Sequence, residues 1–100
     1  MNKFWPVGGD FQTASTGSVR NVLPAGGPII RVARETSSIR VWIKFGDSSV
    51  TADATGLELV SGIVEELENP DPAKYTYYAV ITGSGTCGIN ITAGPRYSIA

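Results

Sequence analysis

Histidine is absent from this sequence, and cysteine occurs only once, at Cys87. Without histidine, the chain lacks both the commonest general base near neutral pH and the commonest zinc ligand. A single cysteine excludes a disulfide within the sequence, and Cys87 lies in an alternating apolar stretch that predicts a small buried core residue rather than a nucleophile. We therefore predict a protein that is not an enzyme and that binds no cofactor and no metal.

Charged residues and long apolar runs are also scarce. Charged residues make up 17% of the 100 positions, and the formal net charge is −1. Binding to nucleic acid requires clustered Lys and Arg that neutralise phosphates, so we expect no nucleic-acid partner. No apolar run approaches the roughly 20 residues that span a bilayer, so we expect no membrane partner and a chain made in the cytoplasm. The length and the 42% hydrophobic content favour one small folded domain.

Short β-prone segments separated by turn residues fill the sequence from Ile29 onward. The clearest is 39–45, in which Ile39, Val41, Ile43 and Phe45 alternate with Arg40, Trp42 and Lys44. Further strands are predicted at 29–34, 57–60, 63–67, 75–82 and 87–92, although 63–67 also fits a single helical turn. A hairpin through Gly83-Ser84-Gly85 is predicted to join the last two. The fold class is all-β, either a small two-sheet sandwich or a jelly-roll-like barrel.

The first 28 residues differ in character from the rest. They are rich in Gly, Ser, Thr and Pro, and their apolar residues, among them Phe4, Trp5 and Phe11, occur singly and without a period of 2 or 3.6. This pattern predicts an extended N-terminal arm over residues 1–28 and a β domain over residues 29–100.

Aromatic and basic residues outside the predicted core are candidates for an interface, because Trp, Tyr and Arg anchor many protein–protein contacts. Trp42 shares a strand face with Arg40 and Lys44, while Tyr78 is out of phase with Tyr77. Two other possibilities remain for Trp42: burial within a second layer of the domain, or stacking on a sugar. The candidate interface residues are Phe4, Trp5, Phe11, Arg40, Trp42, Lys44 and Tyr78.

The only acidic cluster comprises Glu65, Glu66, Glu68 and Asp71. Its spacing does not match a calcium loop, in which oxygen ligands recur around a tight glycine turn. We interpret this cluster as a solvated strand edge.

From Ile39 onward the sequence resembles a family of small virion proteins of tailed bacteriophages. The shared features are an alternating strand that ends in Phe-Gly-Asp, a Ser/Thr-rich loop, a short apolar segment, a strand with glutamates, a Tyr- or Ala-rich strand and a glycine-containing hairpin that closes near Gly-Pro. In this sequence they correspond to residues 41–50, Leu57-Glu58-Leu59, 62–65, 79–82 and 85–92. Residues 1–38 lie outside the resemblance.

The resemblance implies a non-enzymatic virion component made in the host cytoplasm. The first expectation is a decoration, or cement, protein on the capsid exterior, with the major capsid protein and copies of itself, as trimers, for partners. The second is a head-to-tail connector, tail or fibre-associated virion protein. From a different class, a carbohydrate-binding β-sandwich is expected to show an exposed row of aromatic side chains flanked by Asn or Asp.

Overall fold

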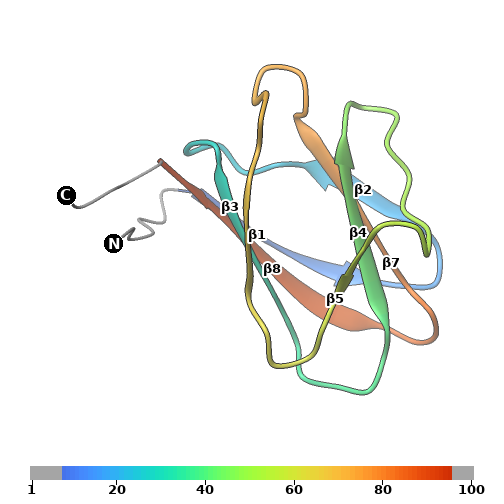
Figure 1. The fold of residues 1–100 in the computed structure, drawn as a ribbon. Coiled ribbons are helices and arrows are strands. Elements are labelled where there is room, and N and C mark those ends of the chain that lie inside the picture. The colour runs from blue at the N-terminus through green and yellow to red at the C-terminus, as the bar shows by residue number, and fades with distance from the viewer. Residues whose placement is uncertain (1–7, 96–100) are drawn as a thin grey trace.

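The computed structural model describes residues 8–95, which form eight strands and no helix (Figure 1). The strands are β1 (Gly8–Ala14), β2 (Val19–Val22), β3 (Ile29–Arg34), β4 (Val41–Gly46), β5 (Leu57–Leu59), β6 (Glu65–Glu68), β7 (Tyr77–Thr82) and β8 (Cys87–Gly94).

The strands build two antiparallel four-stranded sheets. The first sheet has the order β1-β8-β3-β6 and the second has the order β2-β7-β4-β5. Pairing runs from the ends of the chain inward, β1 with β8, β2 with β7, β3 with β6 and β4 with β5. This long ribbon of pairs wraps so that β8 also pairs with β3 and β7 with β4. Such an arrangement is a jelly roll, so the predicted fold class, a two-sheet sandwich or jelly-roll-like barrel, is confirmed.

The hydrophobic core lies between the two sheets and is built by alternate residues of the central strands. On β4, for example, Val41 and Ile43 are buried, while Trp42 and Lys44 lie on the outer face, as the alternation predicts. Cys87 is also buried in this core. The full set of buried apolar core residues is Ala14, Ile30, Val32, Val41, Ile43, Leu59, Tyr78, Val80, Cys87, Ile89, Ile91 and Ala93.

Strand β6 begins two residues later than predicted. Ile63 and Val64 lie in the connection between β5 and β6, and the strand starts at Glu65. The amide of Ile63 donates to the carbonyl of Val60 at 3.2 Å, and Gly62 has a φ of 83°. A turn with its third residue at positive φ favours glycine, so Gly62 fixes the reversal before the strand can begin.

The predicted hairpin between the last two strands is wrong. Strand β7 lies between β2 and β4 in the second sheet, whereas β8 lies between β1 and β3 in the first. Because both sides of β7 are already paired, it cannot pair with β8 as well. The glycine-rich segment 83–86 therefore crosses from one sheet to the other, a path that the same turn residues permit.

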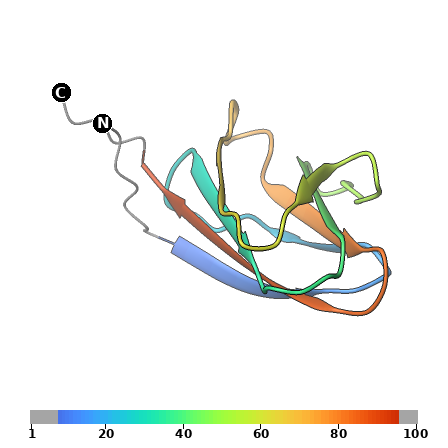
Figure 2. The same ribbon diagram turned by 60° about the horizontal axis from the view of Figure 1, so that its bottom comes forward.

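The N-terminal segment also differs from the predicted arm. Residues 8–14 and 19–22 are strands β1 and β2, at neighbouring edges of the two sheets, so the β domain begins well before residue 29 (Figure 2). The physical reason is that β1 pairs with β8 along its whole length, while its inward Asp10 and Gln12 are held by hydrogen bonds from Asn21. Residues 1–7, and with them Phe4 and Trp5, lie outside the described residues.

Candidate interaction surfaces

The outer face of β4 brings together Arg40, Trp42 and Lys44, as predicted. The Arg40 guanidinium forms two hydrogen bonds of 3.0 Å with the Glu58 carboxylate and lies 4.9 Å from the centre of the Trp42 ring. Lys44 Nζ lies 2.9 Å from an oxygen of Asp53. Trp42 is partly buried on the outer face, so it is not part of the core between the sheets. Each cation on this face already has an anionic partner within the domain.

These pairs also fix the ionisation of the surface. Hydrogen bonding to Glu58 raises the pKa of Arg40, and the same contact lowers the pKa of Glu58. The hydroxyl of Thr55, followed by Lys44, lowers the pKa of Asp53 to about 2. Arg40, Glu58 and Asp53 therefore remain charged through the physiological pH range.

Tyr78 is not an interface residue. Its side chain is fully buried, and its hydroxyl donates a 3.0 Å hydrogen bond to Asp10, which links the second sheet to the edge of the first. Burial of the ring, and then the hydrogen bond to Asp10, raises the pKa of Tyr78. The prediction failed because Phe45 and Tyr78 are opposed in register, so Tyr78 shares the inward face.

Phe11 is the most exposed of the large hydrophobic side chains in the described part of the chain, at 65%. It lies on the outer face of β1, opposite Asn90. Its ring covers Gly88, since a Cβ placed on Gly88 would come within 2.8 Å of Phe11 Cζ. Phe11 is therefore accessible to another molecule, and its role in an interface stays a prediction.

Sequence reasoning missed an apolar surface at the connection between β5 and β6. Val60, Ile63 and Val64 are exposed by 50%, 52% and 54%, and we call these three residues the apolar tip. Their branched side chains suggested a strand, but the Val60–Ile63 turn directs them into solvent. The sequence does place a break at Gly62, between the strands predicted at 57–60 and 63–67. What it does not indicate is that Ile63 and Val64 stay outside the strand that follows.

The apolar tip is anchored to its neighbours. Arg34 donates to the carbonyl of Leu59 at 3.0 Å and to Ser37 Oγ at 2.9 Å, and the amide of Ser37 donates to Ser61 Oγ at 3.2 Å. The β3–β4 and β5–β6 connections accordingly lie at the same end of the barrel (Figure 1). The tip is thus presented from a fixed position.

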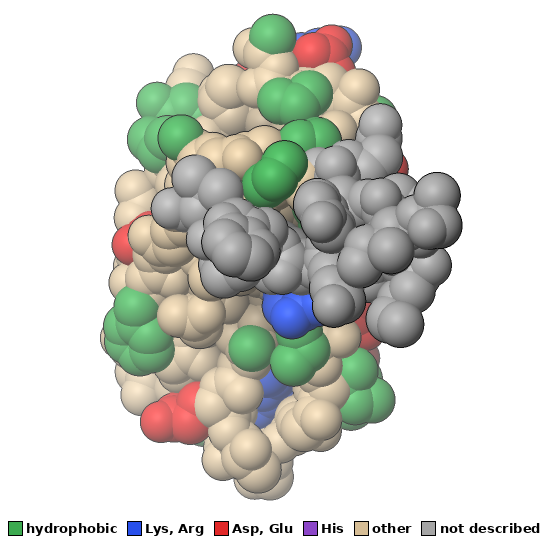
Figure 3. Space-filling model, turned by 90° about the vertical axis from the view of Figure 1, so that its left-hand side faces the viewer, with side chains coloured by type: hydrophobic (Ala, Val, Ile, Leu, Met, Phe, Trp, Pro, Cys, Tyr) green, Lys and Arg blue, Asp and Glu red, His purple; other side chains and the backbone are tan. Residues whose placement is uncertain are grey.

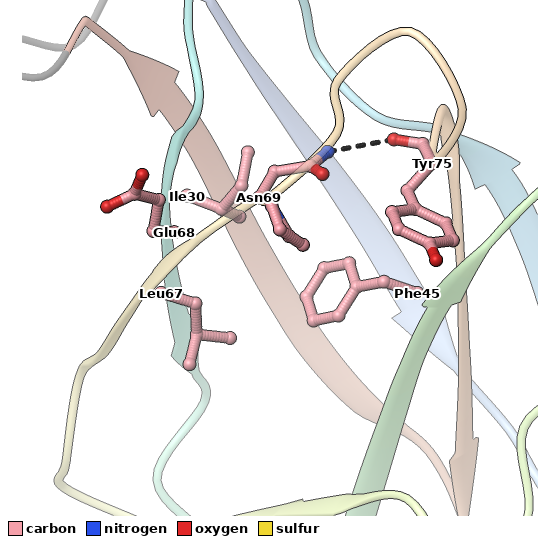
Figure 4. Close-up of a pocket in the computed structure, with 7 residues that line it drawn as sticks. Ile30, Phe45, Leu67, Glu68, Asn69 and Tyr75 are labelled. Atoms are coloured by element: carbon pink, nitrogen blue, oxygen red, sulfur yellow. Dashed lines mark hydrogen bonds between the residues drawn. The ribbon is translucent and has the colours of Figure 1, made fainter.

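A cleft of about 200 Å³ opens between the two sheets near β6. It is mainly apolar, with Phe45 facing Leu67, and the Glu68 carboxylate points away from it (Figure 4). One wall is held by Asn69, whose side-chain amide donates to the Tyr75 carbonyl at 2.8 Å. The cleft brings no set of titratable groups together.

The face seen in Figure 3 carries hydrophobic, acidic and basic side chains in several separate groups, with no broad area of one charge. Among residues 8–95 no three His, Cys, Asp or Glu side chains come close enough to hold a metal ion. No helix in the same range is long and apolar enough to cross a membrane. The acidic residues of β6 lie at a sheet edge, where Glu66 forms a 2.7 Å ion pair with Arg31.

The fold and these surfaces define a small jelly-roll protein whose exposed features are apolar side chains rather than a polar pocket. Comparison with protein-family models, curated proteins and solved structures finds no match for this chain.

Proposed function

We propose that this chain is a non-enzymatic virion protein that binds the outer surface of a tailed-phage capsid and stabilises it. Its partners are the major capsid protein and other copies of itself. The observation that carries the proposal is the apolar tip, in which three aliphatic side chains, each about half exposed, are held at one end of the barrel. Neighbouring apolar side chains that stay exposed in this way are candidates for a protein contact site.

The anchoring of the tip supports this assignment. The hydrogen bonds from Arg34 and Ser37 order the connection before any partner binds, so little conformational entropy is lost on association. A contact of this size is modest by itself. On a particle that offers many equivalent sites, modest contacts are sufficient when neighbouring copies reinforce one another.

The jelly roll gives weaker support, because the same architecture serves both viral capsid proteins and lectins and does not define a function. The carbohydrate-binding alternative is favoured only by Phe11, whose exposed ring lies opposite Asn90. Trp42 does not extend a row with it, since Trp42 lies on the other sheet beneath Arg40. A capsid protein is therefore the better supported partner.

The test uses empty capsids assembled from the major capsid protein of the same phage. We expect the purified chain to co-sediment with them, to saturate at a fixed number of copies per capsomer, and to raise the temperature at which they disassemble. The variant I63D/V64D should bind at least tenfold more weakly, because burying a charged group in an apolar contact is unfavourable. The control V22D alters an equally exposed valine on β2, and it should bind normally.

Three results would argue against the proposal. Absence of co-sedimentation would exclude capsid binding, and labelling of intact virions at the neck or tail would favour a connector, tail or fibre-associated protein instead. Binding to a glycan array that F11A abolishes would favour the carbohydrate-binding module. Circular dichroism of I63D/V64D, compared with the native chain, shows whether a loss of binding comes from a loss of fold.

A further inference from the structure

The two sheets have four edge strands, β1 and β6 in the first and β2 and β5 in the second. An edge strand exposes backbone N–H and C=O groups that can pair with another chain, unless it is short, charged or otherwise blocked. The four edges of this protein differ in how well they are protected.

Three of the edges are blocked. Strand β5 is only three residues long, and three of the four residues of β6 are glutamates, with Pro70 two positions after the strand. Strand β2 has four residues, and its Val22 amide already donates to the side chain of Asn21 at 2.9 Å. None of these three strands therefore offers a partner chain a long, uncharged row of free backbone N–H and C=O groups.

Strand β1 is different. It has seven residues, contains no proline, lysine or arginine, and pairs only with β8, so no other described strand lies along its second side. Its one charged residue, Asp10, is turned toward Asn21 and Tyr78. On the outer face it carries Phe11, which is 65% exposed.

We propose that the β1 strands of two copies of this chain pair antiparallel around a two-fold axis through Phe11, and so join their first sheets into one sheet of eight strands. A two-fold contact of this kind uses the same surface on both chains and closes as a dimer. The inference does not depend on the proposed function. It predicts a dimer, whereas the resemblance to phage proteins implies a trimer.

The sequence of β1 is self-complementary in this register. Phe11 lies opposite Phe11 of the second copy, and Gly9 lies opposite Thr13, which leaves room on the outer face. In the single chain the Phe11 ring lies over Gly88 of β8, so in the dimer each ring turns toward the free edge to pack against the other. On the inner face Asp10 lies opposite Gln12, whose amide can donate to the carboxylate. Cross-strand aromatic pairs stabilise a sheet, whereas like charges directly opposite destabilise it.

Other registers lose these contacts. A shift by two residues in one direction places Asp10 opposite Asp10, and a shift in the other direction places Phe11 opposite Thr13. A shift by one residue moves each side chain to the wrong face of the sheet. The pairing centred on Phe11 is therefore the one that the side chains favour.

The contact between two seven-residue strands is smaller than that of stable dimers, which bury more than about 1,000 Å². The dimer is consequently weak, and it forms at high concentration or where copies are held close together on a surface.

Cysteine cross-linking tests the register. In a C87A background, which removes the one native cysteine, F11C should form a disulfide-linked dimer under mild oxidation, because directly opposed residues lie within disulfide reach. T13C on the same face of β1 should not link to itself, whereas a mixture of the G9C and T13C chains should form a mixed dimer. Equal linking of F11C and T13C, or no linking of F11C, would overturn the proposal.

Sedimentation equilibrium of the unmodified chain supplies the second test. We expect a monomer of 10.5 kDa that dimerises at high concentration, and about tenfold weaker dimerisation for F11D, in which two carboxylates would face each other. A trimer mass, or association that F11D leaves unchanged, would refute the pairing. A chain that remains monomeric but loses capsid binding on F11D would also refute it, since β1 would then receive a strand from the capsid.

Discussion

Tyr78 is the residue whose role changes most between sequence and structure. Its hydroxyl is the only part of the side chain that needs a polar partner, and Asp10 supplies it from the edge strand of the opposite sheet. Asp10 also accepts a 3.0 Å hydrogen bond from Asn21. This small network holds the edges of the two sheets together at the side of β1 and β2.

Removing the hydroxyl with Y78F should lower the free energy of unfolding by about 1.5 kcal/mol, because a hydrogen bond to a charged acceptor is lost in a buried site. Urea denaturation monitored by circular dichroism measures the change. The control Y77F alters the preceding tyrosine, which lies partly buried on the outer face of the same strand, and should change stability by less than about 0.5 kcal/mol. Equal effects of the two substitutions would contradict the assigned role of Asp10.

The same site makes the free energy of unfolding depend on pH in the alkaline range. Burial and the Asp10 carboxylate raise the pKa of Tyr78 above the ordinary value of 10. The folded chain therefore holds this proton more tightly than the unfolded chain, so the contribution is fully present below pH 10 and decreases as the pH rises above it. We expect the melting temperature to fall more steeply above pH 10 in the native chain than in Y78F, and parallel curves would exclude this mechanism.

At the scale of elements, the sequence predicted strands well where one face is apolar and poorly where it is not. Strand β3 has the predicted bounds, and β4 shows the predicted alternation, because Val41 and Ile43 must face the core. Strand β1 lacks such a signal, since its inward Asp10 and Gln12 are polar and are satisfied by side chains distant in sequence. Hydrophobic periodicity therefore does not indicate a strand whose inner face is stabilised by side-chain hydrogen bonds rather than by apolar packing.

Local sequence patterns also could not predict which strands share a sheet. The alternation in β7 and β8 identifies their inward faces, but a glycine-rich turn is equally compatible with a hairpin and with a crossing between sheets. The register of β7 against β2 and β4 decides between them. The apolar tip was missed for a related reason, because Ile63 and Val64 have high strand propensity but lie in the connection before β6.

The position of the apolar tip depends on Arg34, which connects the end of β3 with Leu59 and Ser37. We expect R34M to destabilise the protein by roughly 1–2 kcal/mol, because it leaves partly buried carbonyl groups without donors. Amide hydrogen exchange should become faster in residues 60–64, and capsid binding should weaken. R31M on the same strand removes an exposed ion pair with Glu66, and it should change both quantities less. Unchanged exchange in R34M would show that the tip is held by other contacts.

At the scale of the whole molecule, the strands that pair are mostly far apart in sequence. The first and last strands in the sequence, β1 and β8, pair along seven residues. Of the eight strands, only β4 and β5 are both consecutive in the sequence and paired with each other. Long-range pairing requires the closure of large loops before contacts compensate for the lost entropy. We therefore expect folding with a time constant between about a millisecond and seconds, as for other all-β proteins.

Circular permutation tests this argument because it changes the connectivity while keeping the contacts. Gly8 pairs with Ala93, so the two ends of the described residues lie close together and a short glycine-rich linker can join them. A permutant opened in the exposed segment 70–74 makes β1 and β8 neighbours in sequence, and it should fold faster than the native chain. A permutant with the same linker, opened instead at exposed residues 53–55, loses the local β4–β5 hairpin and should fold more slowly than the first. Stopped-flow fluorescence measures both rates. If the first permutant folded no faster than the native chain, the closure of β1 onto β8 would not limit folding, and equal rates of the two permutants would show that the β4–β5 hairpin does not limit it either.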